Sequence, residues 1–522
     1  MAEGRCGMAG RALRRMAVVA GLGLLAACAS LPPPGPRPQS HAFADTQDTA
    51  LGRFSARART GHAGRDGLYP LADGVEALFA RLRLADMAQR SLDVQYYIWH
   101  NDLTGRLIAR ALLRAADRGV RVRILLDDIG ARARDDTLLA LDAHPGVEVR
   151  LFNPVAERRF RGLGMMTEFA RINRRMHNKA FIADNQAVVT GGRNIGDEYF
   201  EASGEVMFGD LDVLAIGPVV ARSSAVFDAF WSAPAAYPIT ALTGARADAE
   251  AVARQRELLE QAVVAQRDSA YAQSARQAVA QRWLHAPAYD WGEARVVYDA
   301  PDKIERPPED ARGHLMPQLA GLGRELGREL LIVSPYFIPG DAGVAWLRQV
   351  RARGVRVVVL TNSLASTDVG MVHSAYRQYR EALLAAGVEL YEFRPEAHGS
   401  ARTSSITASR ASLHAKTFVF DRQTLFIGSL NLDPRSTRLN TESGLVCDCP
   451  ALAGRLAGRL LGQLDRIAWR LALEPDAAGK PRLVWIEHGP DGERRYAQEP
   501  QTGALRRMSV WLLGLLPLEG QL

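Results

Sequence analysis

Two stretches far apart in the chain carry the same reactive residue types at the same spacing. The shared pattern is H-x-K-x4-D-x6-G-x2-N. One copy consists of His177, Lys179, Asp184, Gly191 and Asn194, and the other of His414, Lys416, Asp421, Gly428 and Asn431. Once the His is given, the other four positions match by chance roughly once in 10^5, so two copies are not an accident.

Histidine transfers protons near neutral pH and is also a nucleophile. A lysine two residues later on a strand points to the same face, because side chains alternate with period two. An asparagine amide donates to phosphate oxygens. We therefore expect both copies to converge on one cationic cradle that holds a nucleophile and an acid, with Asn194 and Asn431 as donors.

Phosphodiester cleavage needs such a cradle, because transition-state charge spreads over the phosphoryl oxygens. A single copy would fit equally well a strand end with a surface His and Lys; the second copy favours the site. The two lysines supply the charge that a metal supplies in other enzymes. The sequence has neither H-E-x-x-H nor carboxylates at clear metal-ligand spacing, so we expect no metal and no organic cofactor.

Two acids are candidates for orienting the imidazoles. Glu442 and Asp210 each open a probable apolar strand that follows one of the motifs. A carboxylate on the distal nitrogen of a histidine fixes its tautomer and stabilises the imidazolium. The alternative is that each acid forms a surface ion pair at a strand end.

The repeat continues upstream of the motifs. Residues 92–98 resemble 331–338, and residues 118–125 resemble 353–360. Each half has the pattern strand, helix, strand, which predicts βαβ units. We therefore expect an α/β fold of two duplicated domains packed face to face, each a mostly parallel sheet flanked by helices.

The N-terminus has the composition of a leader. Four arginines precede a short apolar run, residues 16–27, which is too short to span a bilayer. The sequence Leu25-Ala26-Ala27-Cys28 resembles a bacterial lipobox, which predicts cleavage before Cys28 and acylation of its thiol. A signal anchor or a chance cysteine is the alternative. Among proteins with a lipobox, a residue other than Asp after the cysteine, here Ala29, favours the outer membrane over the inner one.

The expected organisation has six parts. They are a signal peptide, a Pro-rich tether that stands the body off the membrane, a first domain, a helical insertion, a second domain, and a C-terminal helix with an apolar tail, over residues 1–27, 28–65, 66–240, 241–290, 291–460 and 461–522. The tail at 508–518 either packs on the core or dips into an interface. Cys447 and Cys449 are expected to be idle thiols.

Charge is consistent with a lipid partner. The formal net charge is +7, and removal of residues 1–27 takes away four Arg and one Glu, which leaves +4. This modest basicity suits anionic phospholipid and does not require nucleic acid. The interleaved aromatic and basic residues of a strand-binding groove are absent from the sequence.

The duplicated motif, from about Leu92 to Val446, resembles the phospholipase D superfamily. Residues 94–100, 173–179 and 191–199 resemble its bacterial cardiolipin synthase C-like branch. The resemblance implies that one histidine attacks phosphorus and forms a phosphohistidine, while the other protonates the leaving alcohol and then activates the acceptor. By analogy His177 is the nucleophile and His414 the acid and base, although the sequence does not break this symmetry.

The resemblance also assigns supporting roles. Lys179, Lys416, Asn194 and Asn431 would hold the phosphate, and Asp184 and Asp421 would complete the motif by supporting its loop. Ser429 would add a hydrogen bond to the substrate. Arg174 and Arg175 would either meet a second anionic headgroup or lie solvated on the surface.

The implied function is a phosphatidyltransferase that makes cardiolipin. Its expected substrates are phosphatidylglycerol and, as a further donor, phosphatidylethanolamine. A phospholipase D that uses water as acceptor is the close alternative, and a nuclease or other phosphodiesterase is a more distant one. The sequence leaves open an accessory protein and the oligomeric state.

Overall fold

The computed structural model describes residues 31–33, 37, 39–131, 135–158, 160–203, 206–282, 287–395, 410–489, 492–516 and 519–521. The predicted signal peptide and the predicted lipidation site Cys28 lie outside these residues. Among the described residues, none of the helices has the length and apolar character needed to cross a bilayer.

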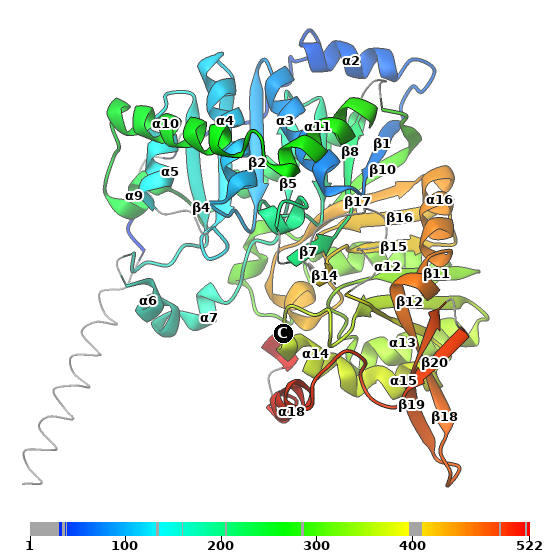
Figure 1. Cartoon of the computed structure of the whole chain (residues 1–522). Helices are drawn as coiled ribbons and strands as arrows, with labels where there is room; N and C mark the ends of the chain where they lie inside the picture. The colour runs from blue at the N-terminus through cyan, green and yellow to red at the C-terminus, as the bar shows by residue number, and fades with distance from the viewer. Residues whose placement is uncertain are drawn as a thin grey trace, which may run out of the picture.

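Each half is built around a βαβ unit (Figure 1). The α4 helix shows why: its N-cap Asp102 accepts a hydrogen bond from the Gly105 N–H, and Ile108 and Leu112 face the core. In the first half the elements are α3 (Gly74–Met87), β2 (Ser91–Tyr96), α4 (Leu103–Asp117), β3 (Arg121–Asp127), α5 (Asp135–Asp142) and β4 (Val147–Phe152). In the second half they are α12 (Leu315–Glu325), β11 (Glu329–Val333), α13 (Gly340–Ala352), β12 (Arg356–Asn362), α14 (Gly370–Tyr376), α15 (Arg380–Ala385) and β13 (Glu389–Phe393).

The expectation of mostly parallel sheets is wrong. Within each half only three strands run parallel, β2–β3–β4 and β11–β12–β13. The strands that follow each motif pair antiparallel: β5–β6 and β15–β16 form tight hairpins, and β8 and β17 return through longer connections. They are β5 (Ala180–Ala183), β6 (Ala187–Gly191) and β8 (Asp212–Ile216), and β15 (Thr417–Phe420), β16 (Thr424–Gly428) and β17 (Ser443–Asp448).

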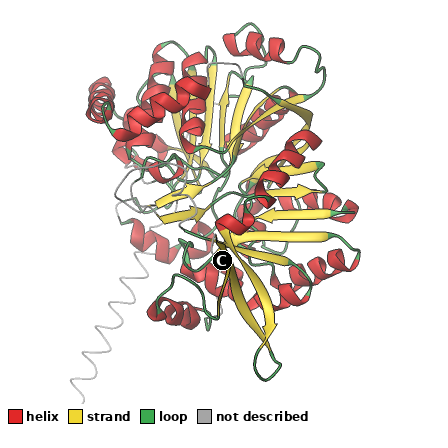
Figure 2. Ribbon diagram, turned by 45° about the vertical axis from the view of Figure 1, so that its right-hand side comes forward, coloured by secondary structure: helices red, strands yellow, loops and turns green. Residues whose placement is uncertain are grey.

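The two halves share one continuous sheet. Strand β1 (Asp66–Leu71) pairs antiparallel with β8 on one side and with β10 (Asp290–Tyr298), the first strand of the second half, on the other. A second, two-stranded sheet also joins the halves, since β7 (Val206–Gly209) pairs parallel with β14 (Arg410–Leu413). The α/β class and the duplication are therefore confirmed, in a mixed rather than a parallel sheet (Figure 2).

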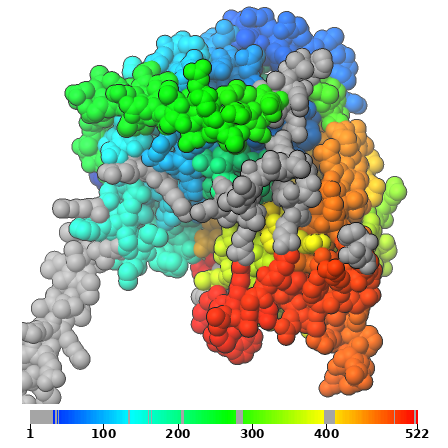
Figure 3. Space-filling view, in the orientation of Figure 1, coloured from blue at the N-terminus to red at the C-terminus, as the bar shows by residue number. Residues whose placement is uncertain are grey.

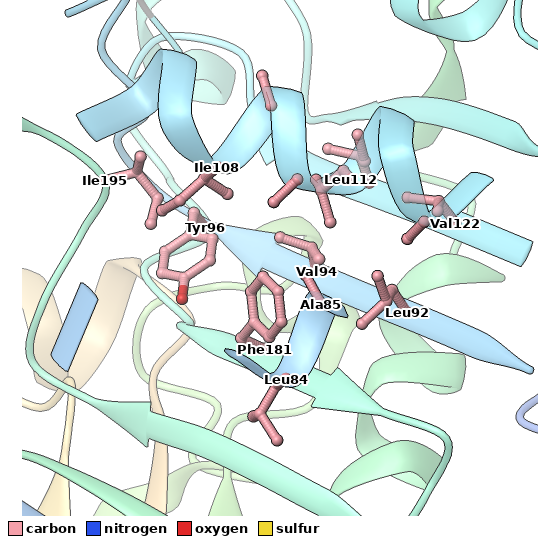
Figure 4. Close-up of a cluster of buried hydrophobic side chains, with 14 of the residues drawn as sticks. Leu84, Ala85, Leu92, Val94, Tyr96, Ile108, Leu112, Val122, Phe181 and Ile195 are labelled. Carbon is pink, nitrogen blue, oxygen red and sulfur yellow. The ribbon is translucent and has the colours of Figure 1, made fainter. Parts of the chain in front are cut away.

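Helices cover the outer face of each half, and a third core lies between the halves. Figure 4 shows the first of these cores, where α3, α4 and β2 meet around Tyr96 and Phe181. The shared core takes Leu125 and Ile182 from the first half and Leu331 and Val419 from the second. The motif strands β5 and β15 thus face each other across buried apolar side chains, which fixes their relative position.

The hairpin after each motif strand explains the motif aspartate. Asp184 and Asn185 both have positive φ, 51° and 53°, as a type I′ turn requires, and Asp421 and Arg422 repeat this at 52° and 56°. The buried carboxylate of Asp184 accepts backbone N–H groups of three successive residues, Gln89, Arg90 and Ser91. Asp421 does the same for Gly327, Arg328 and Glu329.

The described part of the predicted tether does not stand off the body. Arg37 donates to the Ala233 carbonyl oxygen at 3.0 Å, and the Ser40 carbonyl oxygen accepts from Arg123 at 2.6 Å. Leu31 packs on the first core, and the segment continues into α2 (Ala50–Ala58). The proline-rich composition was misleading because these side chains find partners on the first half.

The C-terminal part also differs from the prediction of a helix with an apolar tail. Three strands, β18 (Ala468–Pro475), β19 (Pro481–Gly489) and β20 (Gly492–Tyr496), extend the second sheet beyond β13. The predicted helical insertion contains α10 (Ala249–Gln266) and α11 (Ala270–Arg282). Other elements are α6 (Arg161–Thr167), α7 (Phe169–Ile172), α8 (Pro218–Trp231), β9 (Ala236–Pro238), α9 (Ile239–Thr243), α16 (Pro450–Leu461), α17 (Leu464–Ile467) and α18 (Ala504–Leu513).

Replacing the two motif aspartates by alanine should destabilise the fold unequally. Asp184→Ala leaves the buried N–H of Ser91 and the part-buried N–H groups of Gln89 and Arg90 without an acceptor, and we expect a loss of about 3 kcal/mol in unfolding free energy. Asp421→Ala should lose only about 1 kcal/mol, because the N–H groups of Gly327 and Arg328 are exposed and bind water instead. Urea denaturation of both variants measures this difference, and equal losses would contradict the structural role argued for Asp184.

Candidate active site

The two motifs meet where the halves touch. His177 and Lys179 directly precede β5, and His414 and Lys416 directly precede β15, and all four side chains are buried. The His177 N–H donates to the Thr441 carbonyl oxygen at 2.9 Å, so the backbone of each half is tied to the other. The charge of Lys416 lowers the pKa of His177, and that of Lys179 lowers the pKa of His414. The four side chains thus form one electrostatic unit.

The orienting acids are exchanged between the halves. Nδ1 of His177 lies 2.8 Å from a carboxylate oxygen of Glu442, which belongs to the second half. Nδ1 of His414 lies 2.6 Å from a carboxylate oxygen of Asp210, which belongs to the first half. The two acids predicted from the sequence therefore lie on the two motif histidines, and each leaves the opposite ring nitrogen, Nε2, for chemistry.

Glu442 is held from three sides, and this corrects the role expected for Ser429. The Ser429 hydroxyl donates to the Glu442 carboxylate and accepts the Ser443 N–H at 3.0 Å. The backbone N–H of Glu442 donates to Asp299 at 2.8 Å. Ser429 thus fixes the acid that orients His177 instead of reaching toward a substrate, because its single hydroxyl hydrogen is already donated to Glu442.

The glycine that stands opposite Ser429 in the first motif has a steric reason. A Cβ on Gly192 would lie 2.1 Å from a carboxylate oxygen of Asp210. Only glycine lets the Asp210 carboxylate lie against this backbone and reach His414. Gly191, with φ 155°, likewise meets the backbone of the following strand closely.

The two asparagines are in unequal surroundings. The Asn194 amide donates to the Tyr199 hydroxyl at 3.0 Å, and its oxygen accepts the Ile98 N–H at 3.1 Å. An amide nitrogen carries two hydrogens, so Asn194 keeps one donor for an anion. Asn431 is buried, and its side-chain oxygen has no hydrogen-bond partner among the residues that the structure describes.

Burial and the proximity of the two lysines determine the protonation states of the motif side chains. Burial lowers the pKa of His177 to about 4. Burial and the neighbouring Lys416 lower the pKa of Lys179 to about 7, and burial lowers that of Lys416 to about 8. Such a site binds an anion strongly, because a phosphate between the two ammonium groups replaces their lost hydration and restores their charge.

The two acids remain ionised. Burial alone would raise the pKa of Asp210 and of Glu442, but the charges of the nearby histidine and lysine outweigh it and hold both pKa values below the ordinary ones. An ionised carboxylate on Nδ1 stabilises an imidazolium, and equally a phosphorylated histidine, on the other nitrogen. Each histidine can therefore act as a nucleophile or as a proton carrier.

Aromatic rings line the histidines, and sequence reasoning did not single them out. Tyr97 lies edge-on to His177 with ring centroids 5.1 Å apart. Tyr199 and Phe208 lie 5.3 and 5.1 Å from His414. Tyr97 lies in residues 94–100, one of the stretches that resemble the family. Its neighbour His177 is far along the chain, and spacing along the chain does not reveal such contacts.

Arg175 fits neither of its two expected roles, contact with a headgroup or a solvated surface position. Its guanidinium is buried and lies 2.7 Å from a carboxylate oxygen of Asp127, at the end of β3, where the Met176 N–H also donates. The pair anchors the segment just before His177. Arg174 is half-buried and donates to the backbone carbonyl of Ile304 at 3.3 Å.

Among the described residues, the group at metal-ligand spacing is His100, Asp102 and Glu198. His100 lies 3.2 Å from Glu198. Both carboxylate oxygens of Asp102 already accept backbone N–H groups, from Gly105 in α4 and from Asp197. This group therefore caps α4 and ties it to the loop after the first motif.

Comparison with known proteins gives a consistent result. The family model described as "Cardiolipin synthase, PLD-like domain" matches residues 82–231 and 325–461. The chain is 42% identical to cardiolipin synthase C of Escherichia coli over 88% of this chain and 96% of that protein. It is 32% identical to an uncharacterized protein of Helicobacter pylori, over 85% of this chain and 88% of that protein.

Among solved structures, the phosphatidylserine synthase of Haemophilus influenzae superposes with a TM-score of 0.55. The match covers 88% of this chain and 96% of that one, at 14% sequence identity. At this identity the likeness concerns the fold alone. It extends over both halves and supports the duplicated architecture.

Removing the charge of either acid should slow turnover of a phosphodiester without unfolding the protein. In Glu442→Gln and Asp210→Asn the amide no longer stabilises a positive imidazole, and we expect kcat to fall by roughly 10^2- to 10^4-fold. Steady-state kinetics with circular dichroism as the folding control measures this. A variant that keeps normal kcat would show that the carboxylate on that histidine is structural only.

For an activated phosphodiester, whose leaving group needs no proton from His414, the dependence of kcat/KM on pH should be bell-shaped. The nucleophile must be unprotonated, so activity rises as pH passes the His177 pKa of about 4. The phosphate-binding lysines must be charged, so activity falls as pH passes the Lys179 pKa of about 7. The alkaline limb should move toward the Lys416 pKa of about 8 in Lys179→Arg, because a guanidinium keeps its proton. An unmoved limb would contradict this assignment.

Proposed function

The chain belongs to the cardiolipin synthase family of phospholipase D-like proteins, and we propose that it is a phosphatidyltransferase that makes cardiolipin through a phosphohistidine. The observation that carries the proposal is the pair of motif histidines, each with a buried carboxylate from the other half on Nδ1. Double displacement at phosphorus needs two such histidines, one as nucleophile and one as proton carrier.

In the first step, Nε2 of His177 attacks the phosphorus of a phospholipid. The bond from phosphorus to the headgroup oxygen breaks, and His414 gives its proton to that oxygen. In the second step, the hydroxyl of an acceptor lipid loses its proton to His414 and attacks phosphorus. The bond from phosphorus to nitrogen breaks, and His177 is restored, so the atoms and protons balance over the cycle.

The cations and amides would hold the phosphoryl oxygens. Lys179 and Lys416 neutralise the developing charge, and the spare N–H of Asn194 with the amide of Asn431 donates from either side. Glu442 and Ser429 would stabilise the phosphorylated His177, and Asp210 the protonated His414. The charge of the lysines makes this chemistry possible without a metal.

The proposed donor and acceptor are both phosphatidylglycerol, with phosphatidylethanolamine as a further donor. The support is the 42% identity, over nearly the full length of both chains, to a protein named cardiolipin synthase C. Hydrolysis to phosphatidic acid follows the same steps with water as acceptor and is the alternative. Aromatic rings against both histidines support transfer, because apolar surroundings disfavour water as the acceptor.

We further propose that the enzyme faces the periplasm, anchored by lipid on Cys28, at the outer membrane in preference to the inner one. The support is the lipobox-like Leu25-Ala26-Ala27-Cys28 with Ala29 after it. An accessory protein is not required by the chemistry, since one chain supplies both motifs. Mass spectrometry of the mature protein would detect a diacylated N-terminal Cys28.

Labelled phosphatidylglycerol in vesicles tests the activity. The unmodified protein should form cardiolipin and release glycerol, and His177→Ala should form neither. Phosphatidic acid as the main product would assign a hydrolase. If vesicles with added phosphatidylethanolamine also gave no product, cardiolipin synthesis by this chain alone would be refuted.

The nucleophile can be identified with an activated substrate, phosphatidyl-p-nitrophenol, whose leaving group needs no acid. In His414→Ala the first step should proceed and the second should stall, so a burst of nitrophenol accompanies a phosphatidyl group on His177. His177→Ala should give no burst. Mass spectrometry locates the modified residue, and a burst with modified His414 in His177→Ala would reverse the two roles.

A further inference from the structure

Exposed apolar side chains are concentrated in two short segments. Thirteen large apolar side chains are exposed among the described residues, and ten of them lie between residues 160 and 169 or between 505 and 516. The first group is Phe160, Met165, Met166 and Phe169, and the second is Leu505, Met508, Trp511, Leu512, Leu515 and Leu516. Monomeric proteins rarely expose such groups without a binding role.

The two segments lie at the same end of the molecule. In Figure 1, α6 and α7 lie at the lower edge of the first half, and α18 lies lower still, below the second half and near α14. In the space-filling view the red surface of the C-terminal part lies at the lower end, and the teal surface of the first half lies above it and to the left (Figure 3). Hydrogen bonds tie the end of α7 to the C-terminal turn beyond α18: Asn173, which caps α7, donates to Gln521 at 2.6 Å, and Arg435 donates to the backbone carbonyls of both residues.

The two segments are connected to different halves of the molecule. Helix α7 ends at Ile172, and only Asn173 to Met176 separate it from His177. On the other side, Arg506 in α18 donates to the Thr367 carbonyl oxygen at 3.0 Å. Thr367 follows β12 and so belongs to the half that carries His414. Each apolar segment is therefore connected to one of the two halves.

The charge of residues 504–516 indicates which partner binds the exposed apolar side chains. Between residues 504 and 516 there are two arginines, Arg506 and Arg507, and no acid. Apolar side chains with Trp at their edge and Arg beside them suit a bilayer surface that contains anionic lipid. A helix of ten residues is too short to span a bilayer, so the segment would lie in the interface.

We propose that α6, α7 and α18 form a docking face that inserts into the surface of an anionic phospholipid bilayer and delivers lipid headgroups to the two motifs. This inference rests on the proposed function, since a lipid substrate must leave the bilayer to reach buried histidines. It decides between the two fates left open for the C-terminal tail: Val510 packs on the core, and Met508, Trp511 and Leu512 face outward.

Interfacial kinetics can test the face while every variant keeps Cys28. The face variant is Phe169→Ser combined with Trp511→Ser. The matched control is Leu258→Ser combined with Val264→Ser, because these two side chains of α10 are 59% and 69% exposed and lie at the opposite end of the molecule. Each protein is assayed with phosphatidylglycerol in vesicles and with dihexanoyl phosphatidylglycerol as dissolved monomers.

We expect the face variant to lose about tenfold or more of its turnover on vesicles and to keep its turnover on monomers, because only the vesicle reaction needs insertion. The control should keep both. Equal vesicle turnover in the face variant and the control would overturn the bilayer as occupant and leave a protein partner. An equal loss on both substrates would show that the segments are structural.

Fluorescence tests the insertion of the docking face into a bilayer independently of enzyme activity. Trp511 should be quenched by brominated phospholipid in anionic vesicles, measured as the difference between the unmodified protein and Trp511→Phe. No difference would overturn insertion. If the protein quenches but turns over neither substrate, the proposed function fails and the docking face stands.

Discussion

The exchange of carboxylates between the halves is the interaction on which the site depends. A buried ionised acid is costly unless it is paired and hydrogen-bonded, so Glu442 and Asp210 need fixed partners. His177 is one such partner and His414 the other, each contributed by the opposite half. Neither half can therefore hold its own histidine in the correct tautomer, and the two must be joined rigidly for either to work.

Much of the surrounding structure serves this exchange. The continuous sheet through β1 and β10 fixes the halves against each other. The Arg175–Asp127 pair anchors the segment before His177, and the backbone contact of His177 with Thr441 brings Glu442 within reach. Glycine at position 192 leaves room for the Asp210 carboxylate. These groups touch no substrate, yet loss of any one would misplace a catalytic imidazole.

Duplication gives two similar motifs, but their surroundings have diverged. Glu442 receives an extra hydrogen bond from Ser429, whereas Gly192 offers Asp210 none from a side chain. His177 lies against Tyr97, and His414 lies against both Tyr199 and Phe208, which also contact each other. Two-step transfer requires unequal roles, and these differences give each histidine its own environment. The exposed apolar segments have no such symmetry, since they come from different parts of the chain.

The sequence by itself determined everything that depends on local spacing. The spacing of His177 and Lys179 predicted that they act together, although the structure places both just before β5 rather than on it. The repeat of strand and helix signals gives two α/β halves. The Asp184 turn follows from residue types that tolerate positive φ. Local patterns did not show that strands β5 and β15 turn back in hairpins, so the sheet was expected to be parallel. The sequence did not reveal the packing of the tether segment on the first half, nor the three C-terminal strands, because their partners lie far along the chain.

Only the tertiary structure decided which acid serves which histidine. The two residues of each pair are more than two hundred positions apart, so no spacing rule connects them. The same reason explains why the sequence did not reveal the buried ion pair of Arg175. It also explains why Ser429 was expected to donate a hydrogen bond to the substrate. A buried polar side chain takes whatever partner satisfies it, and that partner is fixed by packing between distant elements rather than by neighbours in sequence.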